Sequence, residues 1–370
     1  MLVILKPNID EESPQFKQTW DYLSSLPDVQ LKKHKVIGKQ QVLTEVYLIG
    51  NTSQIDRKPI EALKAVERVI KISEAYRILG RHRSSDRAVG FNYNGIHFSQ
   101  DNLHIFAGLC AVDSRESVEG MLKALAENGQ TCTRMGAYKP RTNPYSFQGL
   151  GKGCLLDVFE LAGKYGIKVI AMEVTHEKHI EEIDECLQAS GNPTGVMLQI
   201  GTRNAQNFEL LKAIGRQHRY PVLLKRGFGI TLSESLNAAE YLASEGNADV
   251  IFCLRGMKTA FGDPHRNFVD FCHVPVVKRL TRMPVGVDPS HSVGSRSRSI
   301  DGLLEIFHAA AQGIIAGANL VLVDFHPDPS KALVDGPQAL RVEELPYFLE
   351  DIRIVREAYL KRCQLAARVS

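Results

Sequence analysis

Val287-Asp288-Pro289-Ser290-His291 is the stretch around which this 370-residue sequence is organised, because a short apolar strand stops there and a loop begins. Asp288 and His291 lie where the strand passes into the loop, the position at which barrels of parallel strands carry their chemistry. The same design recurs in three further stretches, Ala107-Gly108-Leu109-Cys110, Val321-Leu322-Val323-Asp324-Phe325-His326 and Ala332-Leu333-Val334-Asp335-Gly336. Together they offer a thiolate, an imidazole and two carboxylates, a ligand set that suits a borderline divalent metal ion.

The composition indicates a soluble globular protein, with 44% hydrophobic and 24% charged residues. A net charge of +3 is too small to indicate nucleic-acid binding, although it would suit an anionic small substrate. No apolar run approaches the roughly 20 residues that span a bilayer, and the N-terminus lacks the features of a signal peptide. The seven cysteines have irregular spacings that do not resemble a disulfide framework. We therefore expect a cytoplasmic protein that binds neither nucleic acid nor membrane, in which a special cysteine is a ligand or a nucleophile.

Residues 1–72 predict a small ferredoxin-like α+β domain with the order strand, helix, two strands, helix, strand. The expected strands are 1–5, 29–37, 41–49 and 66–72, and the expected helices are 12–26 and 60–66. The two middle strands are separated by Gly38-Lys39-Gln40, which suits a hairpin. No cluster of catalytic residue types occurs in this domain. A regulatory or assembly role is therefore expected for it.

Residues 73–102 predict a linker followed by a β-hairpin. The segment 73–87 is rich in Arg and Ser, which is typical of a solvated linker. In the next segment, 89–98, the dipeptide Asn94-Gly95 stands between alternating apolar residues and is a strong signal for a two-residue hairpin. A hairpin directly before a barrel is expected to plug one of its ends.

Residues 103–370 alternate short apolar strands with helices, which predicts a (β/α)8 TIM barrel. The eight expected strands are 103–108, 131–137, 169–174, 196–200, 222–225, 250–254, 285–287 and 320–325. The expected helices include 117–128, 155–165, 205–214, 232–245, 303–316 and 344–359. The alternative is an open doubly wound sheet, which requires a first turn of the form G-x-G-x-x-G, whereas Gly108-Leu109-Cys110-Ala111 stands here.

Six cations follow the expected strands at positions that face one end of the barrel. They are Arg134, Lys139, Arg141, Arg203, Lys225 and Arg255. So many cations around one opening would repel each other unless anions bind there, and phosphates and carboxylates are the obvious anions. Any one of them alone would be an ordinary surface residue. For Cys110, His291 and Asp335 the alternatives are a buried apolar cysteine, a phosphate donor and a capping residue, respectively.

Several of these stretches resemble motifs of one enzyme family. Residues 107–114, AGLCAVDS, are similar to the family's AGPCAVES, and residues 139–149, KPRTNPYSFQG, closely match its KPRTSPYSFQG. Residues 200–208, IGTRNAQNF, resemble its IGARNMQNF. The series is completed by Leu224–Gly227, Val287–His291, His326–Pro329 and Asp335–Gln338. The family is 3-deoxy-D-arabino-heptulosonate 7-phosphate (DAHP) synthase, in the branch related to 3-deoxy-octulosonate 8-phosphate synthase, and the resemblance covers nearly the whole chain.

The resemblance implies a transferase that condenses phosphoenolpyruvate with erythrose 4-phosphate in an aldol-type reaction, the first step of the shikimate pathway towards chorismate and the aromatic amino acids. Cys110, His291 and Asp335 match the metal ligands of the family, and Asp324 stands where the family has Glu. The divalent metal ion, which could be Mn, Fe, Co or Zn, would polarise the aldehyde as a Lewis acid. The resemblance also implies a homo-oligomer, a dimer or a tetramer, whose N-terminal domain binds an aromatic amino acid as effector.

The same resemblance implies which residues hold the substrates. Those that match the phosphoenolpyruvate site are Arg134, Lys139, Arg203, Lys225 and Arg255. Arg141 and Thr142 match the site for the aldose phosphate, and Asp288 is assigned to the substrate-binding set as well. Lys139, Cys110 and His291 form the catalytic set, with Lys139 as the proton donor to the aldehyde oxygen.

Three substitutions depart from the family pattern. Leu109 replaces Pro, Leu254 stands where a Glu usually precedes Arg-Gly, and Asp324 shortens a ligand by one methylene. The segment 188–195 is also longer than usual. Two alternatives therefore stay open: a paralogue that uses a different phosphorylated aldehyde in a specialised pathway, or a non-catalytic sensor subunit. The presence of Cys110 and Lys139 favours an enzyme.

Overall fold

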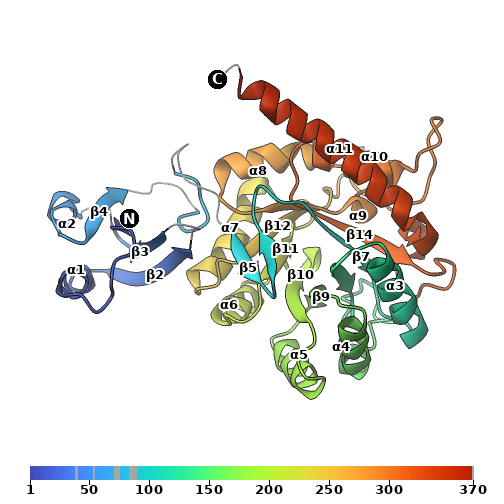
Figure 1. Ribbon diagram of the computed structural model, residues 1–370, viewed down its shortest axis with the longest axis horizontal. Coiled ribbons are helices and arrows are strands. Elements are labelled where there is room, and N and C mark those ends of the chain that lie inside the picture. The colour runs from blue at the N-terminus through green and yellow to red at the C-terminus, as the bar shows by residue number, and fades with distance from the viewer. Residues whose placement is uncertain (38–40, 53–54, 71–75, 83–89, 369–370) are drawn as a thin grey trace. The chain divides into compact units, whose positions relative to one another are not determined.

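The computed structural model of the chain describes residues 1–37, 41–52, 55–70, 76–82 and 90–368 (Figure 1). The chain forms two compact units, Met1–Ser84 and Ser85–Ser370. Within the described residues, no helix combines the length and the apolar character that crossing a membrane requires.

The first unit has the predicted ferredoxin-like fold. Its elements are β1 (Leu2–Leu5), α1 (Pro14–Ser24), β2 (Val29–Ile37), β3 (Val42–Gly50), α2 (Lys58–Glu61) and β4 (Val66–Ile70). The strands form an antiparallel sheet in the order β2-β3-β1-β4. Alternate residues of β1 and apolar residues of α1 form one core, which includes Val3, Leu5, Phe16 and Leu23. Ser13 caps α1 by accepting a hydrogen bond from the Phe16 amide, so the helix begins where a capping residue precedes Pro14.

Two predictions for this part of the chain were wrong. The helix expected at 60–66 covers only Lys58–Glu61, because the Ala65 carbonyl accepts a hydrogen bond from the Lys6 amide and the chain already runs beside β1 there. The expected solvated linker buries three apolar side chains within residues 76–82, Tyr76, Ile78 and Leu79. The rest of that predicted linker, 73–75 and 83–87, and the turn at 38–40 lie outside the described residues.

The second unit is a closed barrel of eight parallel strands surrounded by helices (Figure 1). The strands are β7 (His104–Leu109), β8 (Cys132–Met135), β9 (Val169–Val174), β10 (Gly195–Ile200), β11 (Val222–Lys225), β12 (Val250–Leu254), β13 (Val285–Val287) and β14 (Leu320–His326), and β15 (Leu340–Arg341) extends the sheet beside β14. Because β14 pairs with both β7 and β13, the sheet is closed and the open-sheet alternative is excluded. The helices are α3 (Arg115–Glu127), α4 (Leu155–Lys164), α5 (Lys178–Ala189), α6 (Phe208–Arg216), α7 (Leu232–Ser244), α8 (Val274–Leu280), α9 (Pro289–Val293), α10 (Glu305–Ile315) and α11 (Leu345–Ala366).

The predicted hairpin is formed by β5 (Phe91–Tyr93) and β6 (Ile96–Phe98), and it closes one end of the barrel. Asn94 and Gly95 both have positive φ, 45° and 81°, which is the backbone of a type I′ turn. Phe91 and Phe98 pack on the side chains that fill the barrel interior. The Tyr93 hydroxyl also accepts a hydrogen bond of 2.9 Å from the Val196 amide, near the start of β10. The hairpin therefore covers the end where the strands begin and leaves their C-terminal ends open.

One detail at the C-terminal end differs from the prediction of a loop after Val287. The chain forms the one-turn helix α9, for which Asp288 is the N-cap and accepts a hydrogen bond from the His291 amide. Gly294 ends this helix in the left-handed region with φ 82°. His291 is thus mounted on a capped turn, which fixes the direction of its side chain.

Candidate active site

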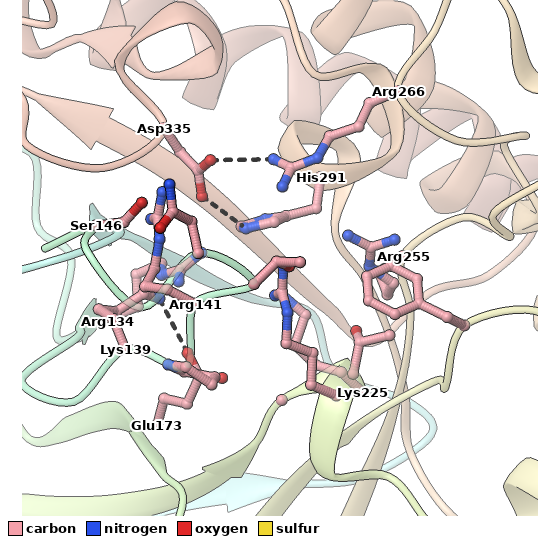
Figure 2. Close-up of a pocket in the computed structure, with 17 residues that line it drawn as sticks. Arg134, Lys139, Arg141, Ser146, Glu173, Lys225, Arg255, Arg266, His291 and Asp335 are labelled. Carbon is pink, nitrogen blue, oxygen red and sulfur yellow. Dashed lines mark hydrogen bonds and ion pairs between the residues drawn. The ribbon is translucent and has the colours of Figure 1, made fainter. Parts of the chain in front are cut away.

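A pocket of about 200 Å³ opens at the C-terminal ends of the strands, and its wall is strongly cationic (Figure 2). Most of the residues predicted for the site line it: Arg134, Lys139, Arg141, Thr142, Arg203, Lys225, Arg255, His291 and Asp335. The other three predicted residues, Cys110, Asp288 and Asp324, are buried behind this wall. The fold therefore gathers the polar strand ends that the sequence identified around one cavity and the layer behind it.

The four predicted metal ligands, Cys110, His291, Asp324 and Asp335, form what we call the ligand cluster, in which the donor atoms all lie within 4.8 Å of one another. Three of the atoms make a tight triangle. Cys110 Sγ lies 3.2 Å from Asp335 Oδ2 and 3.9 Å from His291 Nε2, and the last two atoms are 3.4 Å apart. Bonds of about 2.0–2.3 Å to one tetrahedral ion would place such atoms roughly 3.3–3.7 Å apart. The triangle therefore has the size and the donor chemistry for a single divalent ion.

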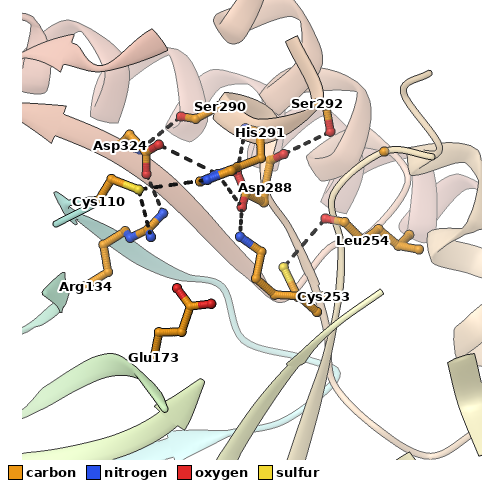
Figure 3. Close-up of polar contacts among 12 residues, drawn as sticks. Cys110, Arg134, Glu173, Cys253, Leu254, Asp288, Ser290, His291, Ser292 and Asp324 are labelled. Atoms are coloured by element: carbon orange, nitrogen blue, oxygen red, sulfur yellow. Dashed lines mark hydrogen bonds and ion pairs between the residues drawn. The ribbon is translucent and has the colours of Figure 1, made fainter. Parts of the chain in front are cut away.

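His291 is oriented by Asp288, which lies behind it and has no exposed surface (Figure 3). The imidazole Nδ1 is 2.9 Å from Asp288 Oδ2, so Nδ1 carries the proton and Nε2 points to Cys110 and Asp335. Burial lowers the pKa of His291, but Asp288 and Asp324 outweigh it and raise that pKa to about 10, so an ion that binds Nε2 must displace a proton from it. The other neighbour of Asp288 is the Lys225 ammonium, with which it forms a buried ion pair. Asp288 thus supports a ligand from behind, and a direct contact between Asp288 and substrate stays a prediction.

Asp324 is the member of the ligand cluster with the strongest competing contacts. One of its oxygens pairs with the Arg134 guanidinium, and the other accepts a hydrogen bond of 2.6 Å from Gln338 Nε2. His291 Nδ1 lies 3.7 Å from Asp324 Oδ2. Both oxygens of this carboxylate, which is one methylene shorter than the family's, are therefore already bound by donors of the protein.

Buried carboxylates neutralise three of the cations. Arg134 pairs with Asp324, Lys225 with Asp288, and Lys139 Nζ lies 2.9 Å from Glu173 Oε2 (Figure 2). Burial alone would lower the pKa of Lys139, but Cys110 and Glu173 more than compensate and raise it above the usual value. Its Nζ is also 3.5 Å from Cys110 Sγ, so Lys139 joins the cationic wall to the ligand cluster.

The other three predicted cations, Arg141, Arg203 and Arg255, have no carboxylate partner among the described residues. Arg255 is 2% exposed, and its Nε and one terminal nitrogen are buried without a hydrogen-bond partner. Burial lowers the pKa of Arg255 to about 10, so the group is protonated at neutral pH. Arg203 donates one hydrogen bond of 3.1 Å to the Thr142 hydroxyl. These guanidiniums retain donors for an external anion.

Leu254 does not face the pocket. Cys253 belongs to the apolar interior of the barrel, and the alternation of a strand turns the next side chain to the outer face (Figure 3). Lys225 is paired in register with Cys253, so Arg226 is the neighbour of Leu254 on that outer face. Arg226 is buried, bound to Asp270, and its Nε has no hydrogen-bond partner. A Glu at position 254 would therefore lie beside Arg226 on the outer face of β12, and an effect of Leu254 on the choice of aldehyde stays a prediction.

The sequence analysis missed three residues that contribute to the site: Phe228, Arg266 and Gln338. Glu173, the next-to-last residue of β9, is one of the residues that the rule for strand ends already places at the site, although the sequence assigns it no separate role. Arg266 bonds to Asp335 at 3.1 Å and to the Gln338 amide oxygen at 2.8 Å. It belongs to the irregular segment after β12, where no periodic pattern indicates which side chains turn inward.

Comparisons with known proteins agree over both units. The DAHP synthetase I family matches residues 80–360, and the DAHP synthase ferredoxin-like domain matches residues 1–74. A phospho-2-dehydro-3-deoxyheptonate aldolase from Thermotoga maritima is 36% identical over 97% of this chain and 98% of its own length. A 2-dehydro-3-deoxyphosphooctonate aldolase from Legionella pneumophila is 26% identical over 70% of this chain and 93% of its own.

Solved structures show the same relationship. The crystal structure of DAHP synthase from Thermotoga maritima superposes with a TM-score of 0.69 at 34% identity, over 96% of this chain and 97% of that one. A truncated form of 3-deoxy-D-arabino-heptulosonate 7-phosphate synthase from the same organism has a TM-score of 0.66 at 33% identity, over 77% of this chain and 98% of that one.

Proposed function

This chain belongs to the DAHP synthetase I family and is an aldolase-type transferase, and we propose that it condenses phosphoenolpyruvate with erythrose 4-phosphate with the help of a divalent metal ion. The products are 3-deoxy-D-arabino-heptulosonate 7-phosphate and inorganic phosphate. One water molecule is consumed, because a carbon–carbon bond forms while the phosphate of phosphoenolpyruvate is released.

The observation that carries this proposal is the position of a metal-ligand triangle at the edge of a cationic pocket. Cys110, His291 and Asp335 supply the triangle, and His291 and Asp335 also belong to the pocket wall. An aldehyde oxygen and two phosphorylated substrates need this combination of a Lewis acid and several fixed cations.

In the proposed enzyme, Cys110, His291 and Asp335 hold the metal ion, and Asp324 completes the set directly or through water. When bound, the ion supplies Lewis acidity to the aldehyde carbonyl. The donor set, one thiolate, one imidazole and carboxylates, suits Zn or another first-row ion and does not select one of them. Asp288 keeps His291 Nε2 free for the ion by occupying Nδ1, at 2.9 Å.

Lys139 is the proposed proton donor to the aldehyde oxygen. Its ammonium lies 3.5 Å from Cys110 Sγ, so it reaches the edge of the ligand cluster where an aldehyde oxygen would bind. Glu173 holds it at 2.9 Å and favours its protonated form. A protonated amine beside a forming alkoxide both stabilises the negative charge and can transfer the proton.

Two groups of residues on the pocket wall support the binding of two phosphorylated substrates. Arg203, Lys225 and Arg255 lie at or just beyond the ends of the adjacent strands β10, β11 and β12 and, together with Arg134 and Lys139, form the proposed seat for phosphoenolpyruvate. Arg141 and Thr142 follow β8 and form the proposed seat for the aldose phosphate. The bond from Arg203 to Thr142 joins the two seats. Since Leu254 faces away from both, its presence gives no specific support to a different aldehyde.

The proposal is tested by measuring phosphate release from phosphoenolpyruvate with erythrose 4-phosphate and with five-carbon aldose phosphates, before and after treatment with a chelator. We expect turnover with erythrose 4-phosphate that is lost on chelation and restored by a divalent ion. Cys110→Ala and His291→Ala should abolish turnover without unfolding the barrel, since both residues lie above its packed interior. Full activity of either variant in metal-depleted buffer would refute the metal assignment.

We also propose that the first unit binds an aromatic amino acid that inhibits the enzyme. A groove of about 310 Å³ on this unit is lined by Phe16, Trp20, Lys33 and Glu11, among other residues. The two aromatic rings stack with centroids 5.9 Å apart, and the Lys33 ammonium lies within 6.0 Å of both. Aromatic faces beside an ammonium and a carboxylate are the groups that an aromatic amino acid requires.

A further inference from the structure

Phe228 lies between the guanidiniums of Arg203 and Arg255, neither of which has a carboxylate partner among the residues that the structure describes. It follows β11 in the loop that begins at Arg226, and β11 is the neighbour of both β10 and β12 in the sheet. Its ring centroid is 4.8 Å from the guanidinium carbon of Arg255 and 5.6 Å from that of Arg203. Both distances lie within the range of about 6 Å at which a cation is attracted to an aromatic face. One ring in the pocket wall thus contacts a cation from each neighbouring strand end.

The loop that carries Phe228 is firmly mounted. The Arg226 amide donates a hydrogen bond of 2.9 Å to the Cys253 carbonyl, and its guanidinium pairs with Asp270 at 2.7 Å. Gly227 fills a space in which a Cβ would come within 2.6 Å of Ile230. The backbone on the N-terminal side of Phe228 is therefore held by a buried ion pair and close packing.

An aromatic ring and a carboxylate differ in how they affect the charge and the N–H donors of a neighbouring cation. A carboxylate neutralises a cation and occupies its N–H donors, as Asp324 does for Arg134. A ring attracts the cation through its quadrupole, carries no net charge, and leaves the in-plane N–H groups free. Arg255 retains Nε and one terminal nitrogen without a protein partner. A buried anion site requires cations that are fixed in place but not already neutralised.

We propose that Phe228 is a positioning residue whose ring holds Arg203 and Arg255 as a pair, so that their free N–H groups converge on one oxyanion group of the substrate. The chemical class of that ligand is a phosphoryl or carboxylate group, and its identity as part of phosphoenolpyruvate rests on the proposed function. The proposed seat for the aldose phosphate, formed by Arg141 and Thr142, is coupled to this ring indirectly, through the hydrogen bond from Arg203 to Thr142.

The test compares variants of the ring in the full-length chain. Phe228→Leu removes the π face and keeps an apolar side chain, whereas Phe228→Tyr keeps the face. Two lost cation–π contacts in a partly desolvated site should raise the KM for phosphoenolpyruvate about 5- to 30-fold. We expect kcat and the KM for the aldose phosphate to change less than about threefold, because the aldose seat is coupled to these contacts only through the Arg203–Thr142 hydrogen bond among the described residues. The Tyr variant should stay within about twofold of the parent protein.

Binding of inorganic phosphate, measured by calorimetry without turnover, separates this proposal from the proposed function. Phe228→Leu should weaken phosphate binding by a similar factor even if no aldehyde phosphate proves to be a substrate. Tyr165→Leu is the matched control, because Tyr165 contacts the Lys164 ammonium at 5.0 Å on an outer helix, away from the pocket. Tyr165→Leu should change neither the dissociation constant for phosphate nor the KM for phosphoenolpyruvate.

A trifluorinated phenylalanine at position 228 keeps the ring shape and reduces its negative face, so it should weaken phosphate binding to a value between those of the parent and the Leu variant. It also supplies a decisive result if the Leu variant folds poorly. The proposal is overturned if the fluorinated and parent proteins bind phosphate equally well. Equal increases in KM for both substrates in the Leu variant would also overturn it.

Discussion

Replacing Asp288 with asparagine removes one charge and tests how Asp288 supports His291, the proposed metal ligand. The asparagine side-chain oxygen can still accept the hydrogen bond from the His291 amide, so α9 keeps its cap. The variant loses the negative charge that now lies 2.9 Å from His291 Nδ1 and that pairs with the Lys225 ammonium. The change therefore acts on the direction and basicity of the imidazole and leaves the backbone that carries it in place.

The structure predicts that Asp288→Asn strongly lowers the affinity for the metal ion. Asp288 is completely buried, so no water molecule can take over its contact with His291. Removing such an outer partner of a metal-bound histidine typically costs 10- to 100-fold in affinity, or about 1.4–2.7 kcal/mol. A second cost falls on folding, because Lys225 is left as a buried charge with no partner. Breaking a buried ion pair in this way destabilises a protein by about 3–5 kcal/mol. Asp288→Asn should thus bind the metal ion less tightly and unfold at a lower temperature.

The assay is competition for Zn²⁺ or Co²⁺ between the protein and a chelator of known affinity, together with thermal unfolding of the metal-free protein. The matched control is Asp113→Asn. Asp113 Oδ2 lies 2.7 Å from His326 Nε2 in another buried pair, which is not part of the ligand cluster or the pocket wall. That control should lose stability and keep its metal affinity. The reasoning is refuted if Asp288→Asn binds the ion within about twofold of the parent, or if the control loses as much affinity.

Three further predictions concern the departures from the family pattern and the N-terminal unit. Asp324→Glu should bind the metal ion more tightly, because one more methylene lets the carboxylate reach the triangle while it stays beside Arg134. The dissociation constant is measured by competition with a chelator. A value equal to or above that of the parent protein would mean that the site is rebuilt around Asp. Leu254→Glu should leave kcat/KM for every aldose phosphate within about threefold, since the new side chain would lie beside Arg226 on the outer face; a changed order of substrates would contradict this placement. Removal of residues 1–72 should abolish inhibition by tyrosine or phenylalanine and leave turnover intact, and inhibition that survives the deletion would assign the effector to the barrel.

Most of the barrel could be predicted because each strand is a short apolar run with a clear end. β11 is bounded by Pro221 and by Arg226-Gly227, and its observed limits, Val222–Lys225, are the predicted ones. The short helix α2 was predicted too long, because helical spacing of apolar residues around Ile60 continues into a segment that pairs with β1 instead. Local periodicity cannot account for a backbone hydrogen bond to a strand 59 residues away, such as that between Lys6 and Ala65.

The site could be predicted at the level of which residues meet, but not at the level of which residues pair. Strand ends bring Lys225 and Arg255 to the same wall, and nothing in the sequence distinguishes their charges. In the fold, Lys225 reaches Asp288, which follows the next strand but one, whereas Arg255 lies against the Phe228 ring and has no carboxylate partner among the described residues. Both side chains face the same pocket, so their position at strand ends does not predict which of them is paired.

Parity along a strand, by which adjacent residues point to opposite faces, explains why position 324 faces the site and position 254 does not. Asp324 points to the interior, where it pairs with Arg134 and belongs to the ligand cluster. Leu254, at the end of β12, points to the outer face of the barrel, so the absence of a carboxylate there leaves the pocket wall unchanged. A sequence comparison alone does not show which face of its strand a residue occupies. It therefore treats the substitutions at positions 254 and 324 as equally important for the site. Effects on metal affinity should therefore follow position 324, whereas effects of position 254 should be limited to the stability of the barrel around Arg226.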